Sequence, residues 1–142
     1  MNRRFVISVV VIFILSILGG MLVHGTILAA EYTKLANAGI YRTPEQAQPL
    51  MGFMMLANLS YAIGITWIYR MGRDNRPWMG QGLRFGLAVA TLTTIPMFLI
   101  YYVVTPMPSD VVAQQIVLDI IVTVIVGLVA AFVNRDPVAA RA

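Results

Sequence analysis

Two ionisable residues, Asp119 and His24, lie inside long apolar stretches of this sequence. A carboxylate and an imidazole held together can exchange a proton, bind a cation or pair as ions. Asp119 is the only acid within an apolar stretch, and an ionisable group inside a membrane span is a functional-site hypothesis by default. Polar residues expected at a similar depth, or on the same helix face, complete the candidate ligand site: Asp119, His24, Asn58, Thr94, Gln115 and Thr123.

This set of polar residues has two interpretations that the sequence leaves open. It can form a pocket that binds a proton, a cation or a small polar ligand, or an interhelical hydrogen-bond cluster that fixes helix register, with Asp119 protonated. Pro96 supplies a further acceptor, because it frees the backbone carbonyl of Leu92. Asn58 is the weakest member, since it points away from the small-residue face of its own helix.

Metal and cofactor chemistry is weakly supported. Met21 and Met54, together with His24, are weak candidates for a Cu(I) site or a haem ligand. Methionine more often fills irregular gaps between helices, and a single histidine is a poor haem signature. The absence of cysteine excludes thiolate chemistry and Cys-based metal sites. We expect no metal, no cofactor and no enzymatic activity, because paired carboxylates and an activated nucleophile are also missing.

Composition defines the elements that must position these residues. Of 142 residues, 59% are hydrophobic and 11% are charged, whereas a soluble domain carries about a quarter charged residues. The apolar stretches are near or above the roughly 20 residues that cross a bilayer as a helix. Helices are expected over residues 5–30 (extending as far as 38), 50–69, 79–104 and 111–133, followed by a short cytoplasmic tail over 134–142. The sequence therefore predicts an all-α polytopic membrane protein, a single up-down-up-down bundle of four transmembrane helices.

Basic residues predict the orientation of this bundle, because short loops rich in Lys and Arg face the cytoplasm. All of the ten Lys and Arg residues except Lys34 and Arg42 fall on one side of the predicted helices. On the other side Glu31, Glu45 and Asp110 outnumber those two. Both termini are therefore expected in the cytoplasm, most simply of a bacterial cell. The net charge of +4 is explained by topology rather than by nucleic acid.

Four arginines around the loop between the second and third helices are expected to set topology and to contact anionic lipid headgroups. They are Arg70, Arg73, Arg76 and Arg84. Arg84 lies about six residues inside Trp78, so it must extend toward the headgroups or hold an anionic headgroup or a partner's acid.

Local signals mark the ends of several helices. Gly39 is suited to end a first helix that projects beyond the membrane. Thr43-Pro44-Glu45-Gln46 has the form of a capping box, and Pro49 should kink the helix that begins there. The N-terminal Asn2-Arg3-Arg4 and the apolar run after it resemble a secretory signal, but the run is long and lacks an A-x-A site, so a retained helix is expected.

Small residues recur at four-residue spacing in every predicted helix, which lets neighbouring backbones approach closely. We interpret these faces as the internal seams of the bundle, although one could equally be a homodimer face. They comprise Ser16 and Gly20 in the first helix, Ser60 and Gly64 in the second, Gly82, Gly86 and Ala90 in the third, and Gly127 and Ala131 in the fourth.

The order of several features is similar to that of a family. Gly19-Gly20 and His24 are followed by Tyr41-Arg42-Thr43-Pro44-Glu45, by Gly80-Gln81-Gly82-Leu83-Arg84-Phe85-Gly86, and then by Ile95-Pro96 and Tyr101. This resembles the small four-helix bacterial inner-membrane proteins classed as domains of unknown function, a resemblance that implies no activity. The small multidrug-resistance transporters share the size and helix count, but they depend on an acid in the first helix, which this sequence lacks.

The sequence therefore predicts a non-enzymatic membrane protein, an accessory or structural subunit or a homo-oligomer packed through its small-residue faces. The alternative is a small transporter or proton-coupled channel component that uses the polar cluster around Asp119 and His24. The expected partners are membrane lipids and a second copy or a larger membrane complex, and no nucleic acid.

Overall fold

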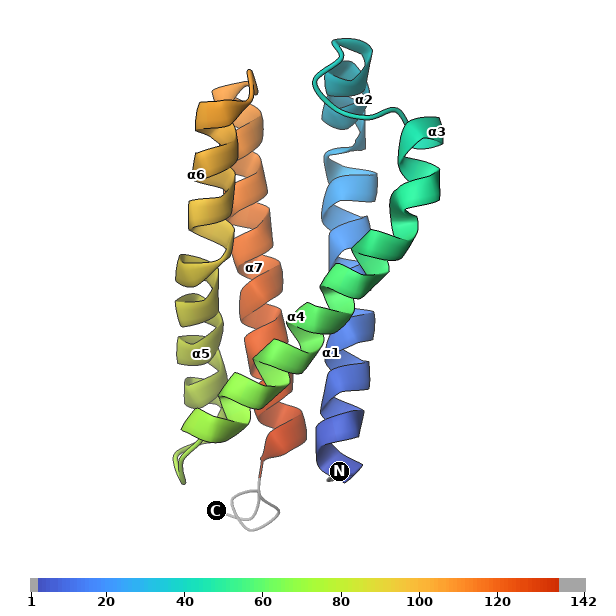
Figure 1. The fold of residues 1–142 in the computed structure, drawn as a ribbon. Helices are drawn as coiled ribbons and strands as arrows, with labels where there is room; N and C mark the ends of the chain where they lie inside the picture. The colour runs from blue at the N-terminus through green and yellow to red at the C-terminus, as the bar shows by residue number, and fades with distance from the viewer. Residues whose placement is uncertain (1–2, 136–142) are drawn as a thin grey trace.

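The computed structural model describes residues 3–135, and this part of the chain is helical without strands (Figure 1). Four segments are long and apolar enough to cross a membrane, as predicted: Arg3–Ile27, Pro44–Gly72, Trp78–Val104 and Ser109–Asn134. Most of the predicted tail, with Arg141, lies outside the described residues. The elements are α1 (Arg3–Leu22), the π-helix η1 (Val23–Ile27), α2 (Ala29–Asn37), α3 (Pro44–Ala47), the 3-10 turn η2 (Gln48–Leu50), α4 (Met51–Gly72), α5 (Trp78–Leu92), α6 (Thr94–Val104) and α7 (Ser109–Asn134).

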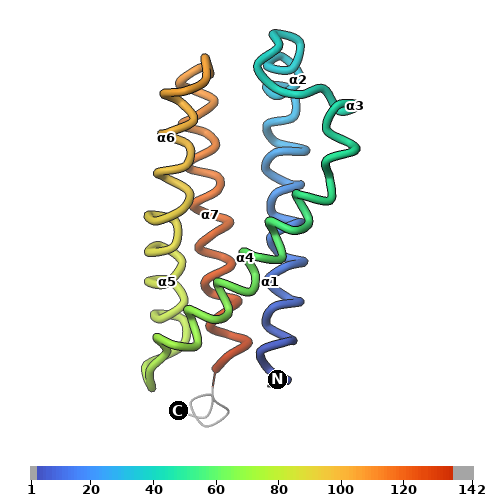
Figure 2. Tube along the Cα trace, in the orientation of Figure 1, coloured from blue at the N-terminus to red at the C-terminus, as the bar shows by residue number. Residues whose placement is uncertain are grey.

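The helices alternate in direction along the bundle (Figure 1). The start of α1, the end of α7 and the connection from α4 to α5 lie at one end, here called the basal end. The α2 segment and the connection from α6 to α7 lie at the opposite, distal end. Figure 2 shows α4 crossing obliquely from α3 at the distal end to α5 at the basal end.

The closest helix contact joins α5 to α7 through glycines. A Cβ atom added to Gly127 would lie 2.6 Å from the backbone oxygen of Gly82 and 2.6 Å from the Cα of Gly86. Both α5 glycines are buried, as are Ala90 and Ala131. The structure thus brings the predicted small-residue faces of these two helices together, and no larger side chain fits between their backbones.

The face predicted for α4 is wrong as an internal seam. Ser60 is exposed, and no atom lies within 4 Å of where a Gly64 Cβ would stand. The buried face instead contains Ala62 and Thr66, which have the same four-residue spacing but lie two positions further along. Two small-residue stripes therefore share this helix, and spacing alone could not decide which of them is buried.

The face predicted for α1 is also displaced. Nothing lies within 4 Å of a Cβ at Gly20, whereas a Cβ at Gly19 would stand 2.6 Å from Cγ1 of Val122 on α7. The Ser16 hydroxyl donates to the Ile12 carbonyl of its own helix at 2.8 Å, so it satisfies itself without a neighbouring helix. The glycine that packs is the adjacent one, about 100° around the helix.

A buried polar cluster fixes α1, α4 and α7 at the basal end. The Asn134 amide donates from Nδ2 to the Ser8 hydroxyl at 2.8 Å and to the Ala130 carbonyl at 2.9 Å. The Ser8 hydroxyl lies 3.3 Å from that of Thr66. The Asn134 amide thus joins α7 to α1, and the Ser8 hydroxyl joins α1 to α4, so the cluster selects the buried face of each helix near this end.

The local signals around the distal connection are confirmed. Gly39 has a φ of 74°, and Ile40 donates its N–H to the Leu35 carbonyl, as in a Schellman motif. Thr43 and Gln46 form the capping box, and Pro49 lies in η2, where the chain changes from α3 to α4.

The predicted helix over residues 79–104 is divided into α5 and α6. The break falls at Thr93, whose backbone has φ −116° and ψ −60°. Pro96 lacks the N–H that would bond to Leu92, and its ring crowds that turn. The chain therefore changes direction three residues before the proline, beside the buried Thr94.

Candidate functional site

His24 and Asp119 meet in the distal half of the bundle. Nε2 of His24 lies 3.3 Å from Oδ2 of Asp119, and the two side chains are 33% and 17% exposed. The contact joins η1 to α7, so two residues 95 positions apart come together inside apolar segments. This partly buried pair is the centre of the candidate site.

The π-helix positions the imidazole. Leu28 donates its backbone N–H to the Val23 carbonyl at 2.9 Å, an i→i−5 bond that widens the turn carrying His24. Single π turns within α-helices are frequently found at functional sites. In a regular α-helix, residues eight positions apart differ in direction by about 80°, and the extra residue in this turn brings Tyr32 closer to the direction of His24.

Tyr32 of α2 holds the other side of the imidazole. Its hydroxyl lies 2.6 Å from Nδ1 of His24, and the two rings stack with centroids 5.6 Å apart and planes at 10°. The hydroxyl also accepts a hydrogen bond from Nε2 of Gln115 at 2.8 Å. His24 therefore has a partner at each ring nitrogen, and its orientation is fixed.

A chain of polar groups continues from Tyr32 across the distal end. Gln115 also donates to the Tyr41 hydroxyl at 3.4 Å, and that hydroxyl donates to the sulfur of Met107 at 3.3 Å. The rings of Tyr32 and Tyr41 pack edge to face, with centroids 5.3 Å apart. The site is thus an ordered network rather than a single ion pair.

The hydrogen bonds favour one proton arrangement. Gln115 donates to Tyr32, so the Tyr32 hydroxyl proton is free to bond to Nδ1 of His24. The imidazole proton then lies on Nε2, directed at the Asp119 carboxylate. Burial raises the pKa of Tyr32 to about 12, against a smaller opposing effect of the Gln115 hydrogen bond, so this hydroxyl stays protonated at neutral pH.

Three of the predicted site residues lie elsewhere. Asn58 donates from Nδ2 to the Met54 carbonyl of its own helix at 2.9 Å, so its inclusion in the cluster is wrong. Thr94 and Thr123 meet each other, with hydroxyl oxygens 3.4 Å apart in the buried contact of α6 with α7. They form a separate contact one turn basal of Asp119, within reach of Tyr61 on α4.

The candidate soft ligands do not join His24. Met21 and Met54 both have exposed side chains. Within residues 3–135, no group of three or more His, Cys, Asp or Glu side chains is arranged to hold a metal ion.

The four predicted headgroup arginines lie at the basal end. Arg73 donates to the Asn134 carbonyl, and Arg70 stands over the Phe5 ring at 5.8 Å. Arg76 pairs with Asp74, and Arg84 donates from Nε to the Gly80 carbonyl at 3.3 Å. The first two tie α4 to its neighbours, whereas the other two stand at the α4–α5 connection.

Sequence reasoning missed Tyr32, Tyr41 and Met107 as site residues. Tyr32 has no apolar segment or motif around it that marks it as a partner of His24 in the sequence. Tyr41 reaches the site because the turn at Gly39 folds the chain back, and its backbone N–H bonds to the Leu35 carbonyl at 3.2 Å. The available signal was the Schellman glycine, which predicts a reversal near Tyr41.

No family model, curated protein or solved structure matches this chain. The resemblance to small bacterial inner-membrane proteins therefore stays a prediction.

Proposed function

We propose that this chain is a multi-pass protein of a bacterial cytoplasmic membrane, with the basal end and both termini in the cytoplasm. Large apolar side chains face outward along all four apolar segments, for example Val103, which is 82% exposed. Soluble proteins rarely expose apolar surface of this extent. The arginines at the basal end support the orientation.

Within that membrane, we propose that the protein is a small transporter or proton-coupled component whose proton site is His24 with Asp119. The observation that carries this proposal is the 3.3 Å contact between Nε2 and Oδ2 inside two apolar segments. An ionised carboxylate inside a membrane span has an unfavourable free energy unless it is paired or protonated. The pair can hold an additional proton at a site that remains partly exposed.

The network supplies a route from proton binding to helix movement. With Asp119 ionised, the carboxylate accepts a hydrogen bond from His24 and attracts the imidazole. A proton added to Asp119 removes that charge and weakens the tie between η1 and α7. The π turn carries one residue more than an α-helical turn, so η1 can rearrange without unwinding α1.

A second candidate function is that of an accessory subunit or a homo-oligomer, because one small-residue face of α4 packs against no other helix of the described chain. Gly52 and Ser60 of α4 are exposed, and Gly64 has open space beside it. Such a face suits close packing against another membrane helix. Because the chain has no cysteine, Ser60→Cys should cross-link dimers in membranes if this face is an interface. Leu87→Cys, on the exposed side of α5, is the control.

Proton flux into liposomes tests the first candidate. The purified full-length protein is reconstituted with a pH-sensitive dye inside, and the external pH is lowered. We expect Asp119→Asn, which keeps the shape of the side chain, to abolish protein-dependent acidification, whereas Asp110→Asn retains it. Asp110 is exposed on the same helix, so it controls for loss of one acid. Equal flux in wild type and Asp119→Asn would exclude Asp119 as the proton site.

A further inference from the structure

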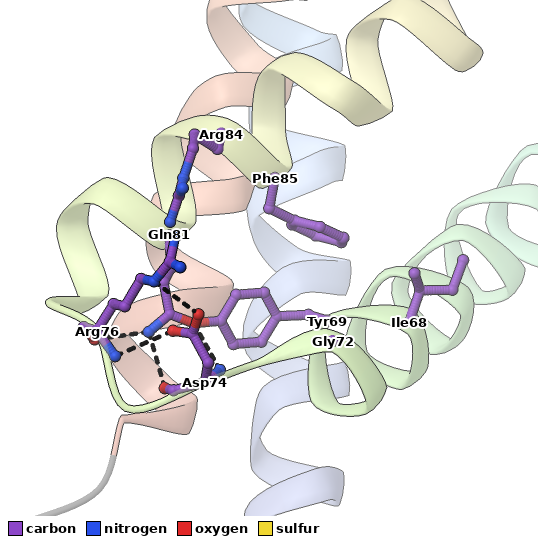
Figure 3. A pocket seen from close by; sticks show the side chains of 8 residues that line it. All are labelled: Ile68, Tyr69, Gly72, Asp74, Arg76, Gln81, Arg84 and Phe85. Atoms are coloured by element: carbon purple, nitrogen blue, oxygen red, sulfur yellow. Dashed lines mark hydrogen bonds and ion pairs between the residues drawn. The ribbon is translucent and has the colours of Figure 1, made fainter.

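The connection between α4 and α5 borders an open pocket at the basal end, far from His24 and Asp119. The pocket has a volume of about 380 Å³. Figure 3 shows its side chains arriving from the end of α4, the loop and the first turns of α5. The polar and aromatic groups that define it are Tyr69, Asp74, Arg76, Gln81, Arg84 and Phe85.

Gln81 fixes the loop that forms one wall. Its Nε2 donates to the carbonyl oxygens of Asp74 and Arg76 at 2.9 and 2.6 Å, and its Oε1 accepts from the Asp74 N–H at 3.1 Å. The loop is therefore held in one shape by the first turn of α5. A pocket with fixed walls binds a ligand with less loss of entropy than a mobile loop.

The charge around this pocket is not balanced. Asp74 pairs with Arg76 through Oδ2 and Nε at 3.1 Å, which leaves the guanidinium of Arg84 without an acid among residues 3–135. Arg84 uses only Nε, toward the Gly80 carbonyl. Among the described residues nothing accepts a hydrogen bond from its two terminal nitrogens. Because the Asp74 carboxylate compensates Arg76, the three charged residues that line the pocket leave one positive charge, that of Arg84.

Tyr69 gives an independent indication of a ligand. The residue is only 5% exposed, and its ring is held edge to face against Phe85, with centroids 5.2 Å apart. Its ring extends toward the loop residues (Figure 3). No described group hydrogen-bonds its hydroxyl. The hydroxyl is therefore available to donate a hydrogen bond to an acceptor that enters the pocket.

We propose that this pocket binds a phosphate group. An Arg with two free terminal nitrogens matches phosphate oxygens in a two-point contact, and the Tyr69 hydroxyl supplies a further donor. In the orientation proposed above, the pocket lies where the cytoplasmic leaflet presents anionic phospholipid. The phosphate can belong to such a lipid or to a soluble phosphate-bearing ligand. The site does not depend on the proton site at the distal end.

Native mass spectrometry of the full-length protein tests the lipid source. With phosphatidylglycerol added to detergent-purified protein, we expect a retained adduct in preference to phosphatidylcholine. Arg84→Gln should weaken it about tenfold and Tyr69→Phe by several-fold, because each removes a donor to a charged group. Arg135→Gln removes one charge at the same end, where Arg135 stacks on Phe132, and should change binding less than about twofold.

Inorganic phosphate tests the soluble source. If phosphatidylglycerol gives no preferred adduct, phosphate should still raise the unfolding temperature of the wild type relative to chloride at matched ionic strength. The same addition should not stabilise Arg84→Gln. The proposal is overturned if neither ligand binds, or if Arg84→Gln and Arg135→Gln weaken binding equally. Circular dichroism and gel filtration check that each variant is folded, and Tyr69→Phe keeps the aromatic contact.

Discussion

Gln115 of α7 donates a hydrogen bond to the Tyr32 hydroxyl at 2.8 Å, while its own Oε1 is buried without a partner in the described part of the chain. The residue is only 1% exposed. A buried acceptor left unpaired is destabilising by about 1–3 kcal/mol, which offsets much of what the two donated bonds contribute. The amide therefore contributes to the connection between His24 and Tyr41 more than to the stability of the fold.

Replacing Gln115 tests whether its donated hydrogen bonds and its unpaired oxygen offset each other in the free energy of unfolding. Gln115→Leu removes the two donated bonds and the unpaired oxygen together, so we expect the free energy of unfolding to change by less than about 1 kcal/mol. Thermal unfolding in mild detergent measures the change. Gln114→Leu is the control, because Gln114 is exposed on the same helix. If Gln115→Leu alone lowered the free energy of unfolding by more than about 2 kcal/mol, the donated hydrogen bonds would outweigh the unpaired oxygen, contrary to this expectation.

The pH dependence of stability tests the burial of Tyr32. Its pKa is raised from 10.0 to about 12, so the folded state holds this proton more tightly than the unfolded state does. The contribution of protonated Tyr32 to the free energy of unfolding is fully present below pH 10 and is lost as the pH rises toward 12. Tyr32→Phe should be less stable than the wild type at neutral pH, by about 1 kcal/mol for the lost hydrogen bonds.

The difference in the free energy of unfolding between the wild type and Tyr32→Phe should narrow between pH 10 and 12, because only the wild type has an ionisable hydroxyl at position 32. Unfolding midpoints measured in the same detergent across that range give the comparison. All other groups that titrate are common to both proteins and cancel. A difference that stays constant to pH 12 would mean that Tyr32 is not held in a buried hydrogen bond.

The packing of α5 on α7 predicts opposite outcomes for two glycines. A side chain at Gly86 would place its Cβ 2.7 Å from the Cα of Val124, a backbone atom that cannot move aside. Gly86→Leu should therefore destabilise the protein by more than about 2 kcal/mol. Gly64→Leu, on the open face of α4, should leave the unfolding temperature of the monomer nearly unchanged. Similar losses in both variants would argue against a specific α5–α7 contact.

The helices were predictable because apolar length and composition are local properties of the chain. The faces were predictable only where a single stripe of small residues exists, as with Gly82 and Gly86 on α5. On α4 the stripes through Ser60 and Ala62 were equivalent in spacing. The choice between them depends on the oblique path of α4 and on the contact of Thr66 with Ser8, which are properties of the assembled bundle.

The central pair of the candidate site was predictable from the sequence, whereas some of the residues around it were not. His24 and Asp119 were recognisable as ionisable groups in apolar segments, and their pairing required only similar depth. Tyr32 was not recognisable, because its approach to His24 depends on a π turn that no residue type specifies. The π-helix itself, Val23–Ile27, contains no proline that would mark an irregular turn in the sequence.

The single histidine of this chain permits a direct test of the proposed proton arrangement. In nitrogen NMR of labelled protein near neutral pH, we expect the neutral imidazole of His24 to carry its proton on Nε2. Asp119→Asn keeps a hydrogen-bonding side chain but replaces the carboxylate acceptor, so it should produce a mixture of the two tautomers. Asp110→Asn should leave the signals unchanged. A proton on Nδ1 in the wild type would reverse the assigned bonds, since Tyr32 would then have to accept from His24 as well as from Gln115.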